Sequence, residues 1–263
     1  MTDLNQALAT TGPTAPPTGK ALIKFEVERY KPVISRALPA SYDGGADRFV
    51  ESVMNAIRTE VVREGKPSLA SCSPLTIVGS ALHAAQLGLE IGPLQQAYLI
   101  PRAGLCTFQL GYKGLIKLAS FAGYETDAHP VYEGDHFDFA YGTEAHLKHV
   151  PHFQSRTAIL YWAMATNLAN RHGRFLVMDK PAIEQARKSA APGSQAWRDH
   201  YDSMARKTVI KALLQLVPLS TRAEALQAAM DTDGIARTEL EAAPSDFEPV
   251  VDIDVVDAEV LPD

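Results

Sequence analysis

Cysteine is scarce in this sequence of 263 residues, which contains only Cys72 and Cys106. Two cysteines exclude a scaffold built on several disulfides and any zinc module with four cysteine ligands. No run of about 18 apolar residues is present, so no transmembrane helix is expected. The first 20 residues lack the basic and apolar stretches of a secretory signal, so the expected location is the cytoplasm.

Motifs of catalysis driven by a nucleotide are also missing. The stretch 104–111 begins and ends with glycine but lacks the Lys-Ser/Thr pair of a phosphate-binding loop, which argues against a P-loop recombinase or helicase. No pattern marks a Ser-His-Asp or Cys-His arrangement, and Cys106 lies in an apolar run typical of a core residue. Nothing in these patterns therefore compels the interpretation of the protein as an enzyme.

Positive charge is absent from the C-terminal end of the chain. The net charge is −6, from 25 Lys and Arg against 31 Asp and Glu, which taken alone argues against a nucleic-acid-binding protein. Nine of the acidic residues lie in 239–263, a stretch without Lys or Arg, so residues 1–238 carry a net charge of +3. This asymmetry is typical of a basic body with an acidic tail, although such a tail also serves simply to keep a protein soluble.

The order of the expected elements indicates the α+β class, with helices at both ends and an antiparallel β-meander between them. Helical apolar spacing, capping residues and glycine stops predict helices over 46–64, 74–87, 115–122, 195–217 and 220–230, and a helix that starts at Asp179. β-type runs between glycines and prolines predict strands over 96–101, 105–110, 124–132, 137–141, 145–150, 157–167 and 173–178. Trp197, Tyr201 and Met204 form an apolar stripe and are expected in the core.

The ends of the chain are expected to be different from this body. Residues 1–20 are rich in Thr, Pro and Ala and predict a disordered arm, and 236–263 predict a flexible acidic tail. Between these ends, a single domain is expected over 21–235.

Two constellations could hold a metal, and each has a simpler interpretation. His146, His149 and His152 are three apart in an expected strand, which places neighbours on opposite faces and prevents convergence on one ion. The carboxylates of Glu133, Asp135 and Asp138 could hold Mg²⁺ for a metal-dependent nuclease, but Asp and Gly at this spacing are also typical of a turn between strands. We favour the turn and keep the nuclease as the alternative function.

Basic and aromatic residues cluster at two other places. Gln109, Tyr112, Lys113 and Lys117 surround a strand-to-helix junction, where backbone N–H groups can hold a phosphate and the ring can stack on a base. Arg206, Lys207 and Lys211 lie on the expected long helix, where a solvated helix face is the plainer explanation. Together the two clusters suggest a nucleic-acid surface.

Four stretches give this suggestion a family. They are 84–90 with 96–101, then 109–116 (Gln-Leu-Gly-Tyr-Lys-Gly-Leu-Ile), 131–137, and 196–197 with 204–210 and 216–220. In this order they resemble the RecT family of phage single-strand annealing proteins, over about residues 20–235. The segment 141–171 matches only in its strand pattern, and the arm and tail lie outside the resemblance.

The resemblance implies an activity that needs no ATP and no cofactor: coating single-stranded DNA, annealing complementary strands and promoting strand invasion in phage recombination. It also implies assembly with further copies into a ring or filament, a phage exonuclease as partner, the cytoplasm of a bacterial host, and no membrane. It carries DNA contact onto Tyr112, Lys113, Arg206 and Lys207. From proximity on the same elements we add Gln109, Lys117 and Lys211, and from charge on the sheet we add Arg102, Arg156 and Arg174.

The acidic tail leaves three hypotheses open. We expect the sheet and the long helix to wall a basic groove for two phosphate backbones. The tail could occupy this groove until DNA displaces it, it could dock onto a host single-strand binding protein, or it could only solubilise the chain.

Overall fold

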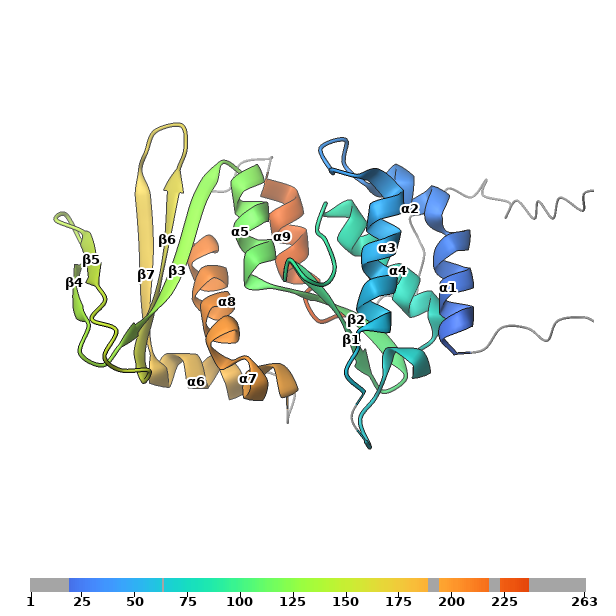
Figure 1. Ribbon diagram of the computed structural model, residues 1–263. Coiled ribbons are helices and arrows are strands. Elements are labelled where there is room, and N and C mark those ends of the chain that lie inside the picture. Colours follow the sequence, from blue (N-terminus) through green and yellow to red (C-terminus); the bar gives the residue numbers. More distant parts are fainter. Residues whose placement is uncertain (1–18, 63, 189–193, 218–222, 237–263) are drawn as a thin grey trace, which may run out of the picture.

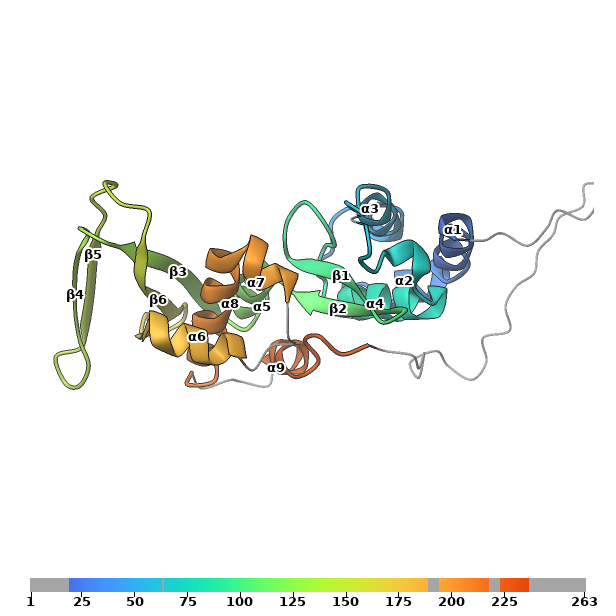
Figure 2. The same cartoon turned by 90° about the horizontal axis from the view of Figure 1, so that it is seen from below.

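The computed structural model describes residues 19–62, 64–188, 194–217 and 223–236. The expected arm, apart from Gly19 and Lys20, and the acidic tail from residue 237 onward lie outside the described residues. The described chain is elongated in both views, with a helical lobe at one end, a sheet-and-helix lobe beside it, and a separate hairpin at the far end (Figures 1 and 2).

The first lobe packs helices around one two-stranded sheet. Its helical elements are α1 (Lys20–Arg29), α2 (Lys31–Ala37), α3 (Gly45–Arg58), the 3₁₀ turn η2 (Leu69–Ser71) and α4 (Pro74–Gln86). Strands β1 (Ala97–Arg102) and β2 (Leu105–Leu110) pair antiparallel through a two-residue turn, Ala103-Gly104, in which both residues have positive φ as tight hairpin turns require. Helix α4 lies at the centre of this lobe because its apolar residues are buried on nearly every side.

The second lobe is a three-stranded antiparallel sheet with helices on one face. Its strands are β3 (Tyr124–Tyr132), β6 (Ala158–Asn167) and β7 (Gly173–Asp179), in the order β3-β6-β7. Helices α5 (Tyr112–Phe121), α6 (Lys180–Lys188), α7 (Gln195–Asp199) and α8 (Tyr201–Leu214) accompany the sheet, and α9 (Glu224–Asp231) lies beside α5 at the middle of the molecule (Figure 1). The inward residues of β6, Tyr161, Ala163 and Ala165, are buried against α8.

A hairpin of β4 (His136–Ala140) and β5 (His146–Val150) is inserted between β3 and β6 and forms a sheet of its own. It reaches the three-stranded sheet through side chains, because the ring of Tyr141 stacks on Phe175 of β7 with centroids 5.0 Å apart. The Tyr141 hydroxyl also accepts a hydrogen bond from the backbone N–H of Val177 at 2.9 Å.

The sequence patterns predict the class and most elements correctly. The α+β class is confirmed, and every expected strand is present within two residues of its expected ends. The expected meander is instead divided among three sheets, because β4 and β5 pair with each other and leave β3 to pair with β6. Helices α1 and α2 are not among the expected elements, and α3 ends at Arg58 rather than residue 64.

The prediction of one long helix over 195–217 is wrong. His200, with φ −137° and ψ 47°, interrupts it and separates α7 from α8. The core residues of this region are nevertheless confirmed: Trp197 is buried, and Tyr201 and Met204 pack against the core.

None of the helices in the described ranges has the length and apolar character that crossing a membrane requires.

Candidate nucleic-acid interface

Strand β2 runs directly into α5 at the seam between the two lobes, and two glycines make this junction possible. A Cβ on Gly111 would lie 2.1 Å from the carbonyl oxygen of Gln95, and one on Gly114 would lie 2.2 Å from that of Gln96. Both distances are far inside van der Waals contact, so only glycine fits where the 95–96 backbone crosses the first turn of α5. The glycines of the Gly-Tyr-Lys-Gly stretch therefore serve close packing.

The two residues between these glycines are accessible. Lys113 is exposed and Tyr112 is half-buried. The guanidinium carbon of Arg206, on α8, lies 5.6 Å from the centre of the Tyr112 ring, within the range of a cation–π contact. The structure thus brings together two residues that are 94 positions apart and that the resemblance assigns to DNA.

Arg206 has unused hydrogen-bonding capacity. Its side chain is half-buried, and its Nε atom is buried without a hydrogen-bond partner in the part of the chain that the structure describes. Tyr98 on β1 lies next to this pair, because its ring approaches Gly111. Burial and the neighbouring Tyr112 raise the pKa of Tyr98. Tyr98 was not among the expected site residues, although it lies in one of the stretches that carry the resemblance.

Lys207 differs from the expected exposed lysine. It is 8% exposed, and its Nζ lies 2.6 Å from Oδ2 of Asp233, just beyond α9. Burial lowers the pKa of Lys207, and the attraction of Asp233 opposes that shift while the positive charges of Lys211 and Arg102 add to it. The expectation that Lys207 lies on an accessible face is therefore wrong, because the turn after α9 covers it.

Lys211 and Lys117 also have partners within the protein. Lys211 Nζ donates to the carbonyl oxygen of Met230 at 2.7 Å, at the C-terminal end of α9. Lys117 Nζ donates to the carbonyl oxygen of Gly88 at 2.7 Å and to Oε1 of Gln96 at 3.2 Å, and burial lowers its pKa. Lys113 and Lys117 are four apart on α5, but Lys113 is exposed, whereas Lys117 is half-buried and connects α5 to the first lobe.

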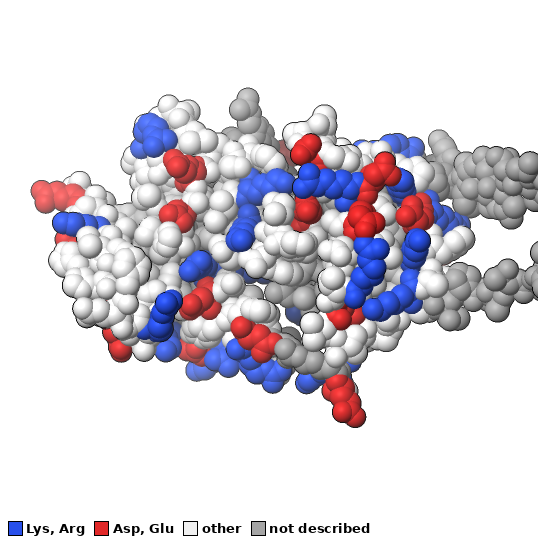
Figure 3. Space-filling view, viewed as in Figure 1, with Lys and Arg blue, Asp and Glu red and all other residues white. Residues whose placement is uncertain are grey.

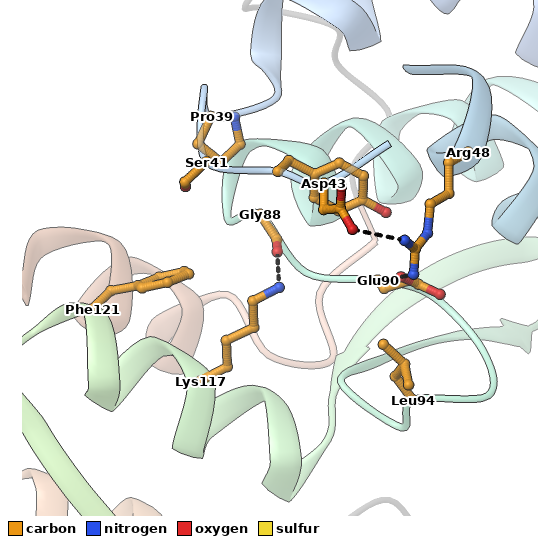
Figure 4. Close-up of a pocket in the computed structure, with 10 residues that line it drawn as sticks. Pro39, Ser41, Asp43, Arg48, Gly88, Glu90, Leu94, Lys117 and Phe121 are labelled. Atoms are coloured by element: carbon orange, nitrogen blue, oxygen red, sulfur yellow. Dashed lines mark hydrogen bonds and ion pairs between the residues drawn. The ribbon is translucent and has the colours of Figure 1, made fainter. Parts of the chain in front are cut away.

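An open cavity of about 200 Å³ surrounds Lys117 (Figure 4). Its other charged groups are paired, since Arg48 lies 3.3 Å from both Asp43 and Glu90. The ammonium group of Lys117 also lies within 6 Å of the ring centres of Tyr42 and Phe121. Because Lys117 and Arg48 both have partners within the protein, neither is a free cation in this cavity. The cavity lies where the two lobes are connected.

The remaining expected site residues lie in several environments. Gln109 is 9% exposed, and its Nε2 lies 3.9 Å from the Met204 sulfur at the seam. Arg102 is exposed at the end of β1, on the Lys207 side of the seam. Arg174 is exposed but donates to the carbonyl oxygen of Leu216 at 2.7 Å. Arg156 is exposed in the connection between β5 and β6, outside the elements that form the seam.

Cationic side chains therefore gather at the seam. Those near it are Arg102, Lys113, Arg206, Lys207 and Lys211, and the carboxylate of Asp233 lies against Lys207. Figure 3 shows Lys and Arg side chains over the middle of the molecule and over the helical lobe, where Asp and Glu side chains lie among them.

The Asp135 region forms a turn, as favoured from the sequence. The Asp135 carboxylate accepts hydrogen bonds from the backbone N–H groups of Tyr132 and His152 at 2.8 and 2.7 Å and lies 3.0 Å from Nε2 of His149. The bonds from His152 and His149 lower the pKa of Asp135 to about 2. Within the described ranges, no group of three or more His, Cys, Asp or Glu side chains is placed to hold a metal ion.

Comparison with known proteins gives matches over most of the chain. The model of the RecT family matches residues 47–245. The protein RecT of Escherichia coli is 29% identical over 230 residues, which cover 83% of this chain and 82% of that protein. An uncharacterized protein of Bacillus subtilis, YqaK, is 30% identical over 174 residues, which cover 64% of this chain and 58% of that protein.

Proposed function

The chain belongs to the RecT family, and on that basis we propose that it binds single-stranded DNA at the seam and anneals complementary strands without ATP. Membership places the chain among DNA-binding proteins of recombination by single-strand annealing. Beyond this membership, we propose that the interface lies at the seam, that no nucleotide is required, and that the protein promotes strand invasion.

The observation that carries the location is the contact between Tyr112 and Arg206. A ring with a guanidinium beside it offers a stacking surface for an unpaired base, which is a sequence-independent way to hold single-stranded DNA. Exposed Lys113 follows Tyr112 on α5 and can neutralise a backbone phosphate, and exposed Arg102 at the turn end of β1 can do the same farther along. Tyr98 adds a second ring on the same side of the junction.

The chemistry of annealing asks little more of a protein than such a surface. Two strands repel each other through their phosphates, so cations that neutralise one backbone lower the barrier to the approach of the second. Stacking on side chains keeps the bases extended while their pairing edges stay free. Neither step consumes ATP, which agrees with a sequence that has no P-loop motif.

Assembly and partners complete the proposal. We expect the protein to act as a ring or filament of many copies, in the cytoplasm of a bacterial host, on single strands that a phage exonuclease has exposed. No cofactor is proposed.

The test mixes two complementary labelled oligonucleotides with the protein in EDTA and without ATP. Duplex formation much faster than in the absence of protein, with both strands intact, supports the proposal. Lys113→Glu should slow annealing, whereas Lys66→Glu, an exposed lysine of the first lobe, should not. Inert protein would contradict the proposal, and strand shortening on addition of Mg²⁺ would favour the alternative of a nuclease that uses Glu133, Asp135 and Asp138.

A further inference from the structure

Asp233 lies at a point where three elements meet. Its Oδ1 accepts a hydrogen bond from the backbone N–H of Leu110 at 2.9 Å, and its Oδ2 lies 2.6 Å from Nζ of Lys207. The side chain is 12% exposed, so both interactions are largely shielded from water. One carboxylate thus connects the end of β2, the middle of α8 and the turn after α9.

The turn that carries Asp233 is fixed on both sides. Gly234, with φ 84°, donates its N–H to the carbonyl oxygen of Phe108 at 2.9 Å. The Thr232 hydroxyl lies 2.7 Å from Nε2 of His83 on α4, and Lys211 binds the carbonyl oxygen of Met230. The turn therefore touches α4 and β2 of the first lobe and α8 of the second.

The two residues that Asp233 connects are the sequence neighbours of the stacking pair. Leu110 precedes Gly111 and Tyr112, and Lys207 follows Arg206. The distance between the Tyr112 ring and the Arg206 guanidinium therefore depends on how α8 is held against the junction of β2 and α5. Asp233 contacts both segments, and its carboxylate neutralises the buried Lys207 where they meet.

We propose that Asp233 is a positioning residue of the DNA interface, which keeps Arg206 beside Tyr112 by neutralising the buried Lys207 where α8 packs against the junction of β2 and α5. This inference rests on the proposed function. It gives Lys207 a role different from the expected DNA contact, because its ammonium group acts on DNA only through Asp233 and the neighbouring arginine.

Two variants of the full chain distinguish this positioning role of Asp233 from a direct contact of Lys207 with DNA. Asp233→Asn keeps an oxygen for the N–H of Leu110 but leaves the buried Lys207 without its counter-charge, so the segment is expected to shift. Single-stranded DNA affinity should fall about tenfold, which is the size of a typical coupling between residues in contact. The double variant Lys207→Met/Asp233→Asn contains no unpaired buried charge, and its affinity should return to within about twofold of the wild type.

Salt titration adds an independent measurement. A lysine that touches a phosphate contributes about one unit to the slope of log affinity against log salt concentration. The slope of Lys207→Met/Asp233→Asn should equal that of the wild type. A slope reduced by about one unit, with affinity still about tenfold lower, would show that Lys207 contacts DNA directly and would overturn the proposal.

A control separates positioning from a general loss of stability. Ile57→Ala removes a fully buried side chain of α3, and its melting temperature can be compared with that of Asp233→Asn. At a temperature where both remain folded, only Asp233→Asn should lose DNA affinity. An equal loss in both variants, or wild-type or higher affinity of Asp233→Asn, would overturn the proposal. Where Asp233→Asn does not fold, the double variant decides by itself through its affinity and salt slope.

Failure of the proposed function has a different signature. In that case the wild-type protein itself neither binds nor anneals single strands. If the wild type anneals, the affinities and salt slopes of the Asp233 variants test the role of Asp233 alone.

Discussion

The lysines of α5 and α8 differ in what their ammonium groups contact, although all of them are spaced alike along their helices. Lys113 is exposed. Lys117, Lys207 and Lys211 bind Gly88, Asp233 and Met230, which come from distant parts of the sequence. A buried lysine needs such a partner, since an unpaired charge in the interior is strongly unfavourable. Charge reversal should therefore affect DNA affinity at exposed Lys113 and stability at buried Lys207.

Lys113→Glu should weaken binding of single-stranded DNA without changing stability, because the side chain is exposed. Lys207→Glu places a second carboxylate against Asp233 and should lower the free energy of unfolding by about 3–5 kcal/mol. Chemical unfolding and fluorescence anisotropy with a labelled oligonucleotide measure the two effects. Unaltered stability of Lys207→Glu would contradict the buried pair, and normal affinity of Lys113→Glu would show that the interface lies elsewhere.

The sequence predicts a site region but not the environment of each residue in it. The Gly-Tyr-Lys-Gly stretch and the Met-Ala-Arg-Lys stretch (204–207) stay predicted DNA contacts, and the structure brings Tyr112 and Arg206 together. Helical spacing cannot show that Asp233 covers Lys207, because that contact depends on where α9 packs. Sequence patterns miss Tyr98 for the same reason, because it comes near Tyr112 only through the crossing of the 95–96 backbone over α5.

At the scale of elements, local signals predict strands and helix starts well and helix interruptions poorly. Alternation and glycine turns are local, so the strands appear where they are expected. The break at His200 has no proline or glycine to mark it and depends on the packing of α7 against α8. The pairing of β4 with β5 also depends on contacts at the base of their hairpin, and these contacts can be tested.

The base of the hairpin should lose stability in acid. The pKa of Asp135 is lowered from its ordinary value of 3.8 to about 2, so its contribution to stability is complete well above pH 3.8 and is lost as the pH falls through about 2. Hydrogen exchange of residues 136–150, corrected for the intrinsic rate, should therefore accelerate between about pH 4 and pH 2. Asp135→Asn should exchange faster at neutral pH and show a smaller change over this interval. Equal pH profiles would mean that Asp135 does not anchor the hairpin.

Helix α7 is held to the lobe mainly by Trp197. Its side chain is 4% exposed and meets Tyr201 of α8 edge-on, with ring centres 5.6 Å apart. Trp197→Ala should lower the free energy of unfolding by about 3–5 kcal/mol, the range found for large aromatic residues in a core. Arg198→Ala changes the exposed neighbour and should leave stability unchanged. Denaturant unfolding compares them, and a small effect at Trp197 would mean that α7 contributes little to the core.

At the scale of the whole molecule, opposite charges are separated along the chain. Residues 1–238 carry a net charge of +3, whereas 239–263 carry nine acidic residues and no basic one. The cations at the seam are only partly neutralised within the described residues, by Asp233. An acidic segment joined to the same chain has a high effective concentration near that surface, so it can compete with DNA phosphates.

A chain that ends at Thr238 should therefore bind single-stranded DNA more tightly than the full chain. The gain should be largest at low salt and shrink as the salt concentration rises, because the Debye length falls to about 10 Å at 0.1 M and screens the tail from the cations. A tail of unchanged length with Asn and Gln in place of its nine acids is the matched control, and it should behave like the truncation if charge is the cause. Equal affinity of all three proteins across salt would leave the tail as a solubilising segment. Equal affinity together with slower annealing only on strands coated by the host single-strand binding protein would instead support docking onto that protein.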